Sequence, residues 1–170
     1  APLQSERDVS FCRADFHRQV VFDGVDFNGV RHVSFAHADF GGEGDVSFAG
    51  TNFKNRGHVA YNKADFENYG DVTFQGAIFK YGDVSFSVTD FENSEDVSFE
   101  EVEFRDGGTV AFHDSDFLNP AGVSFKELTL EDFHLLNFRG STFIEDVEID
   151  ITAENGARVS FIRTDCSRAN

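Results

Sequence analysis

Acidic side chains are the residues whose type and spacing best suggest chemistry in this chain. One set of aspartates directly precedes recurring phenylalanines: Asp15, Asp26, Asp39, Asp65, Asp90 and Asp116. A second set precedes recurring valines: Asp45, Asp71, Asp83 and Asp96. Columns of such carboxylates could hold Ca²⁺, which prefers several oxygen ligands. Aspartate also caps turns by accepting nearby backbone N–H groups, and Asn52 and Ile78 replace it in two phrases. We therefore expect turn caps, with no metal and no cofactor.

Nucleophilic catalysis has weak support in the sequence. His113, Asp114 and Ser115 are consecutive, but neighbouring residues of a strand point to opposite sides, and no oxyanion-hole motif accompanies them. Cys12 falls at a corner of the repeat and Cys166 at a core position. Neither has a motif that would lower the pKa of a thiol. We expect a protein that is not an enzyme and has no catalytic residues.

The distribution of charge suggests a binding surface instead. Residues 1–85 contain 12 acidic and 8 basic residues, whereas residues 86–170 contain 19 acidic and 6 basic residues. The acidic excess begins in one short stretch, in which Arg105 is the local basic residue. We predict that an acidic binding surface there comprises Glu92, Glu95, Asp96, Glu100, Glu101, Glu103 and Asp106.

These residues lie within a repeated phrase that covers most of the chain. Its clearest copies begin at Val46, Val72, Val84 and Val97 and read V-S-F-x-x-[AT]-[DN]-F, with small variations. The period is usually 13 residues, and 21 of the 22 phenylalanines fit this frame, with Phe133 outside it. Apolar residues alternate with polar ones inside each phrase, which indicates short half-buried strands. A fixed short period of this kind is typical of a solenoid.

The number of phrases in each coil follows from packing. A coil of one phrase would enclose two aromatic rings in a perimeter of 13 residues, which is too small for native packing density. A coil of one phrase would, however, turn Lys54, Lys80, Arg105, Glu67 and Glu92 into a column of alternating charge. We take packing as the stronger constraint and predict two 13-residue repeats in each coil.

The five-residue halves of the phrase resemble a known family. Units such as Ala14-Asp15-Phe16, Ala64-Asp65-Phe66 and Thr89-Asp90-Phe91 are similar to those of pentapeptide-repeat proteins, over roughly residues 8 to 166. The resemblance implies an all-β, right-handed β-helix with four sides. This chain departs from the family pattern because three extra residues follow every second unit. Some members imitate duplex DNA, occupy the DNA groove of topoisomerases and dimerise through their C-terminal ends.

The ends of the chain depart from the phrase. We expect residues 1–7 to form an N-terminal cap or to be disordered, and residues 8–130 to form the regular solenoid. Residues 131–170 should form irregular final coils and a C-terminal cap, since Phe133, Leu135 and Ile151 add apolar residues there. All three segments belong to one domain.

Composition narrows the choice of partner. A net charge of −17 disfavours direct binding of nucleic acid or of an anionic membrane, and no apolar run is long enough for a membrane span. We expect a non-enzymatic acidic module that mimics duplex DNA toward a basic protein surface, such as a type II topoisomerase, and that forms a homodimer through its C-terminal end. The alternative is a structural spacer or scaffold segment of a larger or secreted protein. We expect a cytoplasmic location; a secreted one is the alternative, because the N-terminal residue is not Met.

Overall fold

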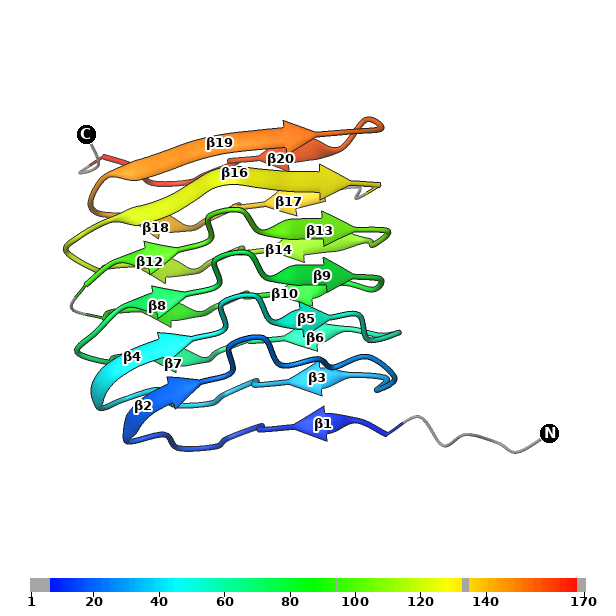
Figure 1. Ribbon diagram of the computed structural model, residues 1–170. Helices are drawn as coiled ribbons and strands as arrows, with labels where there is room; N and C mark the ends of the chain where they lie inside the picture. Colours follow the sequence, from blue (N-terminus) through cyan, green and yellow to red (C-terminus); the bar gives the residue numbers. More distant parts are fainter. Residues whose placement is uncertain (1–6, 94, 133–134, 168–170) are drawn as a thin grey trace.

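The computed structural model describes residues 7–93, 95–132 and 135–167. Parallel strands stack coil upon coil along one axis, with β1 (Val9–Ser10) at one end and β20 (Arg158–Ser160) at the other (Figure 1). The described residues form no helix, and so include none that is long and apolar enough to cross a membrane. The predicted all-β solenoid is confirmed, while its handedness and four-sided cross-section stay predictions.

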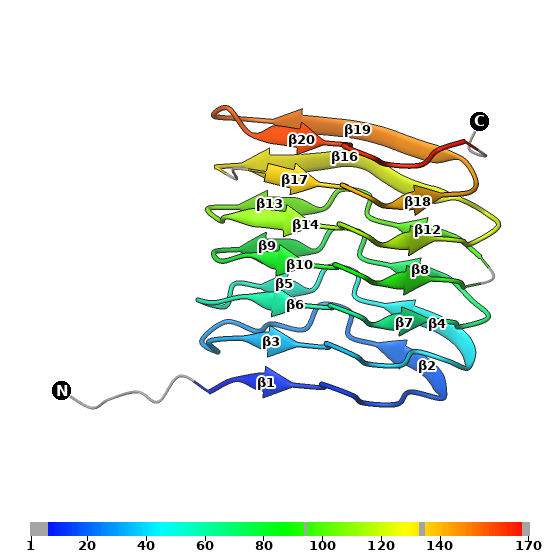
Figure 2. The ribbon, with the colours of Figure 1, turned by 180° about the vertical axis from the view of Figure 1, so that it is seen from behind.

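Strand pairing falls into four columns, numbered in chain order. Column 1 is a seven-stranded sheet made of β1, β3 (Val33–Ser34), β6 (Val59–Ala60), β10 (Val84–Ser85), β14 (Thr109–Ala111), β17 (Leu135–Asn137) and β20. Column 2 contains β7 (Asp65–Phe66), β11 (Asp90–Phe91), β15 (Asp116–Phe117) and β18 (Thr142–Phe143). Isolated bridges extend column 2 to Asp15 at one end and Asp165 at the other. Columns 1 and 2 face the viewer in Figure 2.

Columns 3 and 4 face the viewer in Figure 1. Column 3 consists of β2 (Arg18–Val21), β4 (Glu43–Ser47), β8 (Val72–Thr73), β12 (Val97–Ser98) and the first parts of β16 (Val123–Glu131) and β19 (Val147–Ala153). Column 4 consists of β5 (Asn52–Phe53), β9 (Ile78–Lys80), β13 (Glu103–Arg105) and the later parts of β16 and β19. The long strands β16 and β19 therefore join columns 3 and 4 into one sheet.

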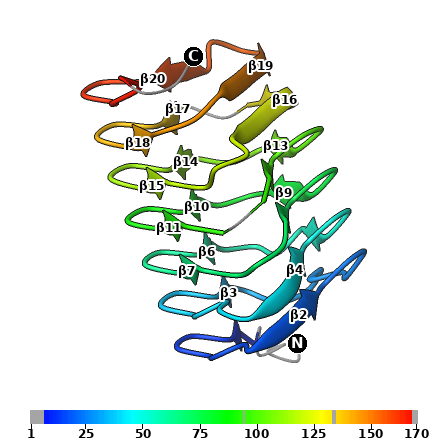
Figure 3. The ribbon, with the colours of Figure 1, turned by 90° about the vertical axis from the view of Figure 1, so that its left-hand side faces the viewer.

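The register shows how many residues each coil uses. Val33 pairs with Val59, 26 positions later, and Leu136 pairs with Val159, 23 positions later. These distances correspond to two phrases, so equivalent phrases in successive coils stack directly on one another. The side view in Figure 3 shows the coils as separate layers.

The core consists of ladders of aromatic rings. Seventeen phenylalanines are buried, and Phe11, Phe16 and Phe22 pack against them from partly buried positions. In column 1, Tyr61 stacks on Phe35 and Phe86 with ring centroids 4.9 and 4.8 Å apart. Rings of column 3 meet those of column 1 edge to face, as Phe74 meets Phe86 at 5.2 Å and 86°. Both arrangements suit the quadrupole of an aromatic ring.

Most corners between the two halves of a phrase use left-handed backbone. The second corner residue has positive φ in successive coils, as at Gly50 (61°) and Gly76 (64°) between columns 3 and 4. Between columns 1 and 2 the same position holds Lys63 (56°) and Val88 (55°). Positive φ is unusual for a β-branched residue, so Val88 marks a strained corner.

The joints between phrases depend on buried asparagines. The buried Asn68 donates from Nδ2 to the carbonyls of Gly44, Gly70 and Asp71, at 2.9 to 3.2 Å. Asn55, Asn93 and Asn119 do the same in other coils. Gly57 and Gly70 in these joints do not have positive φ. A Cβ on Gly70 would lie 2.3 Å from Asp45 Oδ1, so close packing requires glycine there.

The final coil continues the columns but has no described coil above it. β20 pairs with β17, and β19 pairs with β16 across a register shift that removes one corner residue. Ile149, Val159 and Phe161 are 37 to 45% exposed, although equivalent residues of earlier coils are buried. Cys166, expected in the core, is exposed for the same reason. Of the terminal segments expected from the sequence, residues 1–6 and Phe133 lie outside the described residues.

Candidate binding groove

An acidic groove runs across column 3, over the outer surface of β8, β12, β16 and β19. Its floor is a row of outward hydroxyls, in which Thr73, Ser98 and Ser124 pair in register. Glu148 continues the row on β19. The period-two alternation of the phrase explains this row, because the valine before and the phenylalanine after each hydroxyl point into the core. The groove encloses about 560 Å³.

Carboxylates define both edges of the groove. Asp71, Asp96 and Asp146 lie along one edge, at the residue before each strand, and Glu100 lies along the other. Together with Glu148, five carboxylates line the groove, and none of its described lining residues is basic. Because neighbouring strands are about 4.8 Å apart, Asp71 and Asp96 lie one strand spacing apart along the first edge, and Gly122 separates Asp96 from Asp146.

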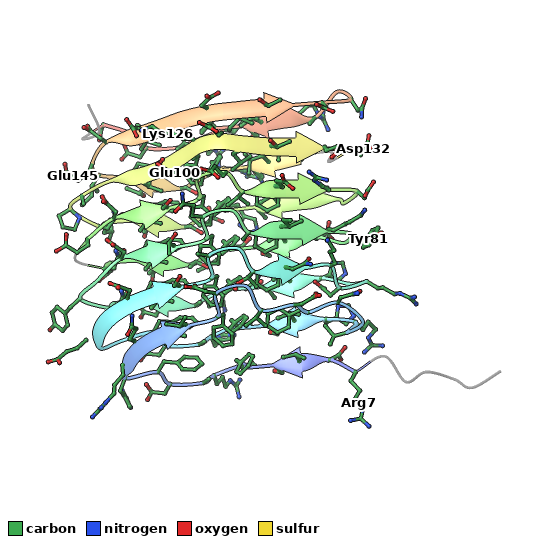
Figure 4. All side chains as sticks on the ribbon, in the orientation of Figure 1. Arg7, Tyr81, Glu100, Lys126, Asp132 and Glu145 are labelled. Atoms are coloured by element: carbon green, nitrogen blue, oxygen red, sulfur yellow. The ribbon has the colours of Figure 1, made fainter. Side chains whose placement is uncertain are left out.

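Hydrogen bonds hold several of these side chains in place. Asp71 Oδ1 accepts the backbone N–H of Asp96 at 3.1 Å, and the Ser124 hydroxyl donates to Glu100 Oε1 at 2.7 Å. Lys126 borders the groove and pairs with Glu148, and this hydrogen bond raises the pKa of Lys126. Figure 4 shows Glu100 and Lys126 on the side of the molecule that carries β12 and β16. The carboxylates are therefore oriented before any partner arrives.

The structure does not bring all seven predicted acidic residues onto one surface. Asp96 and Glu100 line the groove, while Glu101 and Glu103 line a neighbouring hollow of about 380 Å³ over column 4. Glu92 follows β11 in column 2, and Glu95 lies in the joint before β12. The seven residues therefore span half a coil rather than one face.

Basic residues also neutralise part of the predicted surface. Asp106 pairs with Lys80 at 3.1 Å, and Glu103 pairs with Arg105 at 2.8 Å. Arg105 also lies 3.5 Å from Glu131. Arg105 is the local basic residue in the sequence, and Lys80 adds a contact from the coil below that the linear sequence does not show.

Sequence reasoning missed Asp71, Asp146 and Glu148 as members of one site. The available signal was their spacing: Asp71 and Asp96 are 25 residues apart, as are Thr73 and Ser98. The hydroxyls of Ser34 and Ser85 belong to column 1 and those of Ser47 and Thr73 to column 3. These hydroxyls can be assigned to their columns only when the two-phrase period of the coil is known.

A second group of carboxylates lies on column 2. Asp39, Asp65, Asp90 and Asp116 pair in register through successive coils. Burial, with Glu67, Asp39 and Asp90 nearby, raises the pKa of Asp65 to about 6. Burial likewise raises the pKa of Asp90, as does the neighbouring Asp116. The neighbouring carboxylates of column 2 therefore repel one another.

Metal binding by the aspartates and nucleophilic catalysis at Ser115 find little support among the described residues. Asp26 and Asp39 accept the backbone N–H groups of Asn28 and Gly41 at 2.8 Å, as turn caps do. No described cluster of three or more His, Cys, Asp or Glu residues is arranged to hold a metal ion. His113 and Asp114 approach to 3.3 Å, but the buried Ser115 hydroxyl donates to the carbonyl of Phe86.

Comparison with known proteins adds no identity. No model of a known protein family matches the chain, and no curated protein matches it. Membership of the pentapeptide-repeat family stays a prediction.

Proposed function

We propose that this protein is a non-enzymatic binding module whose groove on column 3 receives a basic segment of a partner protein. The observation that carries the proposal is the set of five carboxylates that line one groove, Asp71, Asp96, Glu100, Asp146 and Glu148. Lysine and arginine side chains would meet carboxylates along both edges, and their N–H groups would find hydroxyl acceptors on the floor.

A finer version of the proposal is mimicry of duplex DNA toward a type II topoisomerase. Seven strands of column 1, separated by about 4.8 Å, give a length of about 29 Å. Duplex DNA of that length has about 17 phosphates, at one per ~1.7 Å, and the net charge here is −17. Carboxylates also lie on columns 2 and 4, so the charge is divided among several faces.

The test compares two variants that lose the same four charges. The groove variant contains Asp96→Asn, Glu100→Gln, Asp146→Asn and Glu148→Gln. The control variant contains Glu67→Gln, Glu92→Gln, Glu145→Gln and Glu154→Gln, all at exposed positions outside the groove. Thermal melting should show that both variants keep the fold.

Binding of an arginine-rich peptide is measured by calorimetry, and inhibition of a purified type II topoisomerase by its supercoiling activity. We expect the groove variant to lose at least tenfold in peptide affinity and the control variant to lose much less. Salt should weaken binding by the wild type, because exposed charges are screened beyond about 10 Å at 0.1 M. Equal losses in both variants would refute the groove. Peptide binding without inhibition of the topoisomerase would refute the DNA-mimic version alone.

A structural spacer is the second candidate function. The observation that favours it is the aromatic core, which continues through every described coil and is open at the final one, where Phe161 stacks on Phe138 but remains 42% exposed. A spacer requires no groove, so it predicts that the groove variant and the control variant behave alike with every basic partner.

A further inference from the structure

The two ends of the solenoid present complementary unfinished surfaces. At the C-terminal end, the exposed apolar residues Ile149, Val159 and Phe161 lie on β19 and β20 or directly after them. At the N-terminal end, Val9, Phe11 and Phe16 are only partly buried, whereas equivalent rings of inner coils are fully buried. The strand β1 lies at one end of the stack, and β19 and β20 lie at the other (Figure 1).

The backbone at the two ends is also complementary. Within the stack, the valine and phenylalanine of a phrase donate N–H groups to carbonyls of the next coil, as Val33 does to His58 at 3.1 Å and Val123 to Asp146 at 3.0 Å. In the last coil the equivalent donors are Val147 and Val159. In the first coil the equivalent acceptors include the carbonyl of Asp8. No described coil supplies their partners, so the described residues at each end present strand-edge groups of the kind that pair with another chain.

We infer that copies of this protein stack end to end, with the first coil of one copy on the last coil of the next. If the second copy continues the coil of the first, this continuity determines the rotation of the second copy about the solenoid axis. After Asp165 in column 2, the next pass of the chain would lie over column 3, so β1 of the second copy lies on β19 of the first. A half-turn about the axis achieves this, and it also places β2 of the second copy on β20. Columns 1 and 3 carry the same V-S-F phrase, so apolar residues meet apolar residues.

Charges at the proposed contact agree with this arrangement. The exposed corner residue Arg13 of the second copy would lie over the register shift that contains the exposed Asp150 of the first. Arg18 of the second copy would lie near the joint that contains Glu154. Asp8 would stack on Asp146, as Asp96 stacks on Asp71 within the molecule, where the lower carboxylate accepts the N–H of the upper residue. The contact is heterologous and does not close, so it produces open oligomers rather than a single dimer.

Variants blocked at one end provide the test. Ile149→Lys with Val159→Lys blocks the C-terminal end, and Val9→Lys with Phe11→Lys blocks the N-terminal end. Far-UV circular dichroism and thermal melting establish that each variant is folded. Sedimentation velocity over a concentration series should show a growing range of oligomers for the wild type and monomers for each blocked variant. An equimolar mixture of the two should give a one-to-one complex and nothing larger, because each retains the end that the other lacks.

Other outcomes would overturn the inference. Dimers of the variant blocked at the N-terminal end would show contact between two C-terminal ends instead. A wild type that stays monomeric up to millimolar concentration would show that the ends do not associate. A charge swap gives a milder check: Arg13→Asp and Asp150→Arg should each raise the association midpoint concentration at least threefold, and the double variant should restore it. Failure of the double variant to recover would contradict the half-turn register.

Discussion

Several polar side chains in this protein make their hydrogen bonds and ion pairs with residues one coil away rather than with residues close in sequence. Asp96 bonds to Asp71, Ser124 to Glu100 and Lys80 to Asp106. Each of these pairs is about one coil apart along the chain. Substitutions should therefore act through the coil above or below.

Asp65 should make the free energy of unfolding depend on pH. Its pKa is about 6 in the folded protein against an ordinary 3.8, because of burial and neighbouring carboxylates. The folded state therefore binds the proton more readily than the unfolded state, and this group adds stability as pH falls from about 7 toward 4. Asp65→Asn should be more stable than the wild type at pH 7, and the difference should disappear near pH 4.

Urea unfolding at several pH values measures this difference. Asp26→Asn is the matched control, because Asp26 pairs in register with the uncharged Asn52. The effect of Asp65→Asn is compared with that of this control at each pH. A destabilised Asp65→Asn at pH 7 would contradict the assignment of repulsion to column 2.

Val88 should be replaceable with a gain in stability. Its φ of 55° is unfavourable for a β-branched residue, and its side chain is 43% exposed. Val88→Gly should stabilise the protein by ~1 kcal/mol, from the ~1–2 kcal/mol cost of left-handed backbone reduced by the flexibility of glycine when unfolded. Gly76→Val is the converse control, because φ is 64° there and space for a Cβ is open. Thermal melting should move in opposite directions for the two variants.

At the scale of elements, the ladders of rings provide most of the packing. Phe74 is fully buried, stacks on Phe48 and Phe99, and meets Tyr61 and Phe86 edge to face. Phe16 is partly buried and stacks on Phe40 alone, with Phe11 tilted beside it. A coil in the middle is therefore supported on both sides and the first coil on one.

Deletion of a ring should reveal this difference. Phe74→Ala should cost ~3–5 kcal/mol, because neighbouring coils prevent the cavity from collapsing. Phe16→Ala should cost clearly less. Denaturant unfolding of both variants measures the two losses, and equal losses would mean that the first coil is as well supported as the middle.

Most of the strands and of the core could be predicted from the sequence, because the spacing of the phenylalanines determines both. The packing argument also gave the two-phrase coil that the register between Val33 and Val59 displays. The straight strand β19 could not be predicted, because in a single sequence the loss of one corner residue beside Ile149 looks like ordinary variation of the repeat. The buried joints around Asn68 could not be predicted from the sequence, since Asn and Gly near a turn usually indicate positive φ.

The candidate groove could be predicted only in part. Asp96 and Glu100 were identified from local charge, but Asp71, Asp146 and Glu148 come from other coils. The local density of acidic residues also led to the inclusion of Glu92 and Asp106, which follow β11 in column 2 and β13 in column 4. A linear stretch passes through several columns within one coil, so only the period of the coil sorts residues by face.

At the scale of the whole molecule, the described coils form a stack with an acidic groove on one side and exposed apolar residues on the last described coil. Binding at the groove and stacking at the ends share Asp146 and otherwise use different residues. The blocked-end variants retain Asp71, Asp96 and Glu100, so they should still bind a basic peptide.

The most direct measurement of the central claim is the map of amide chemical shifts during titration with an arginine-rich peptide. We predict that the largest changes occur at Thr73, Ser98 and Ser124, on the floor of the groove, and that added salt reduces them. Ser34 and Ser85, which occupy the same position of the phrase in column 1, should change little. Largest changes at Asp65, Glu67 and Glu92 in column 2, or equal changes in all four columns, would contradict the groove as the recognition surface.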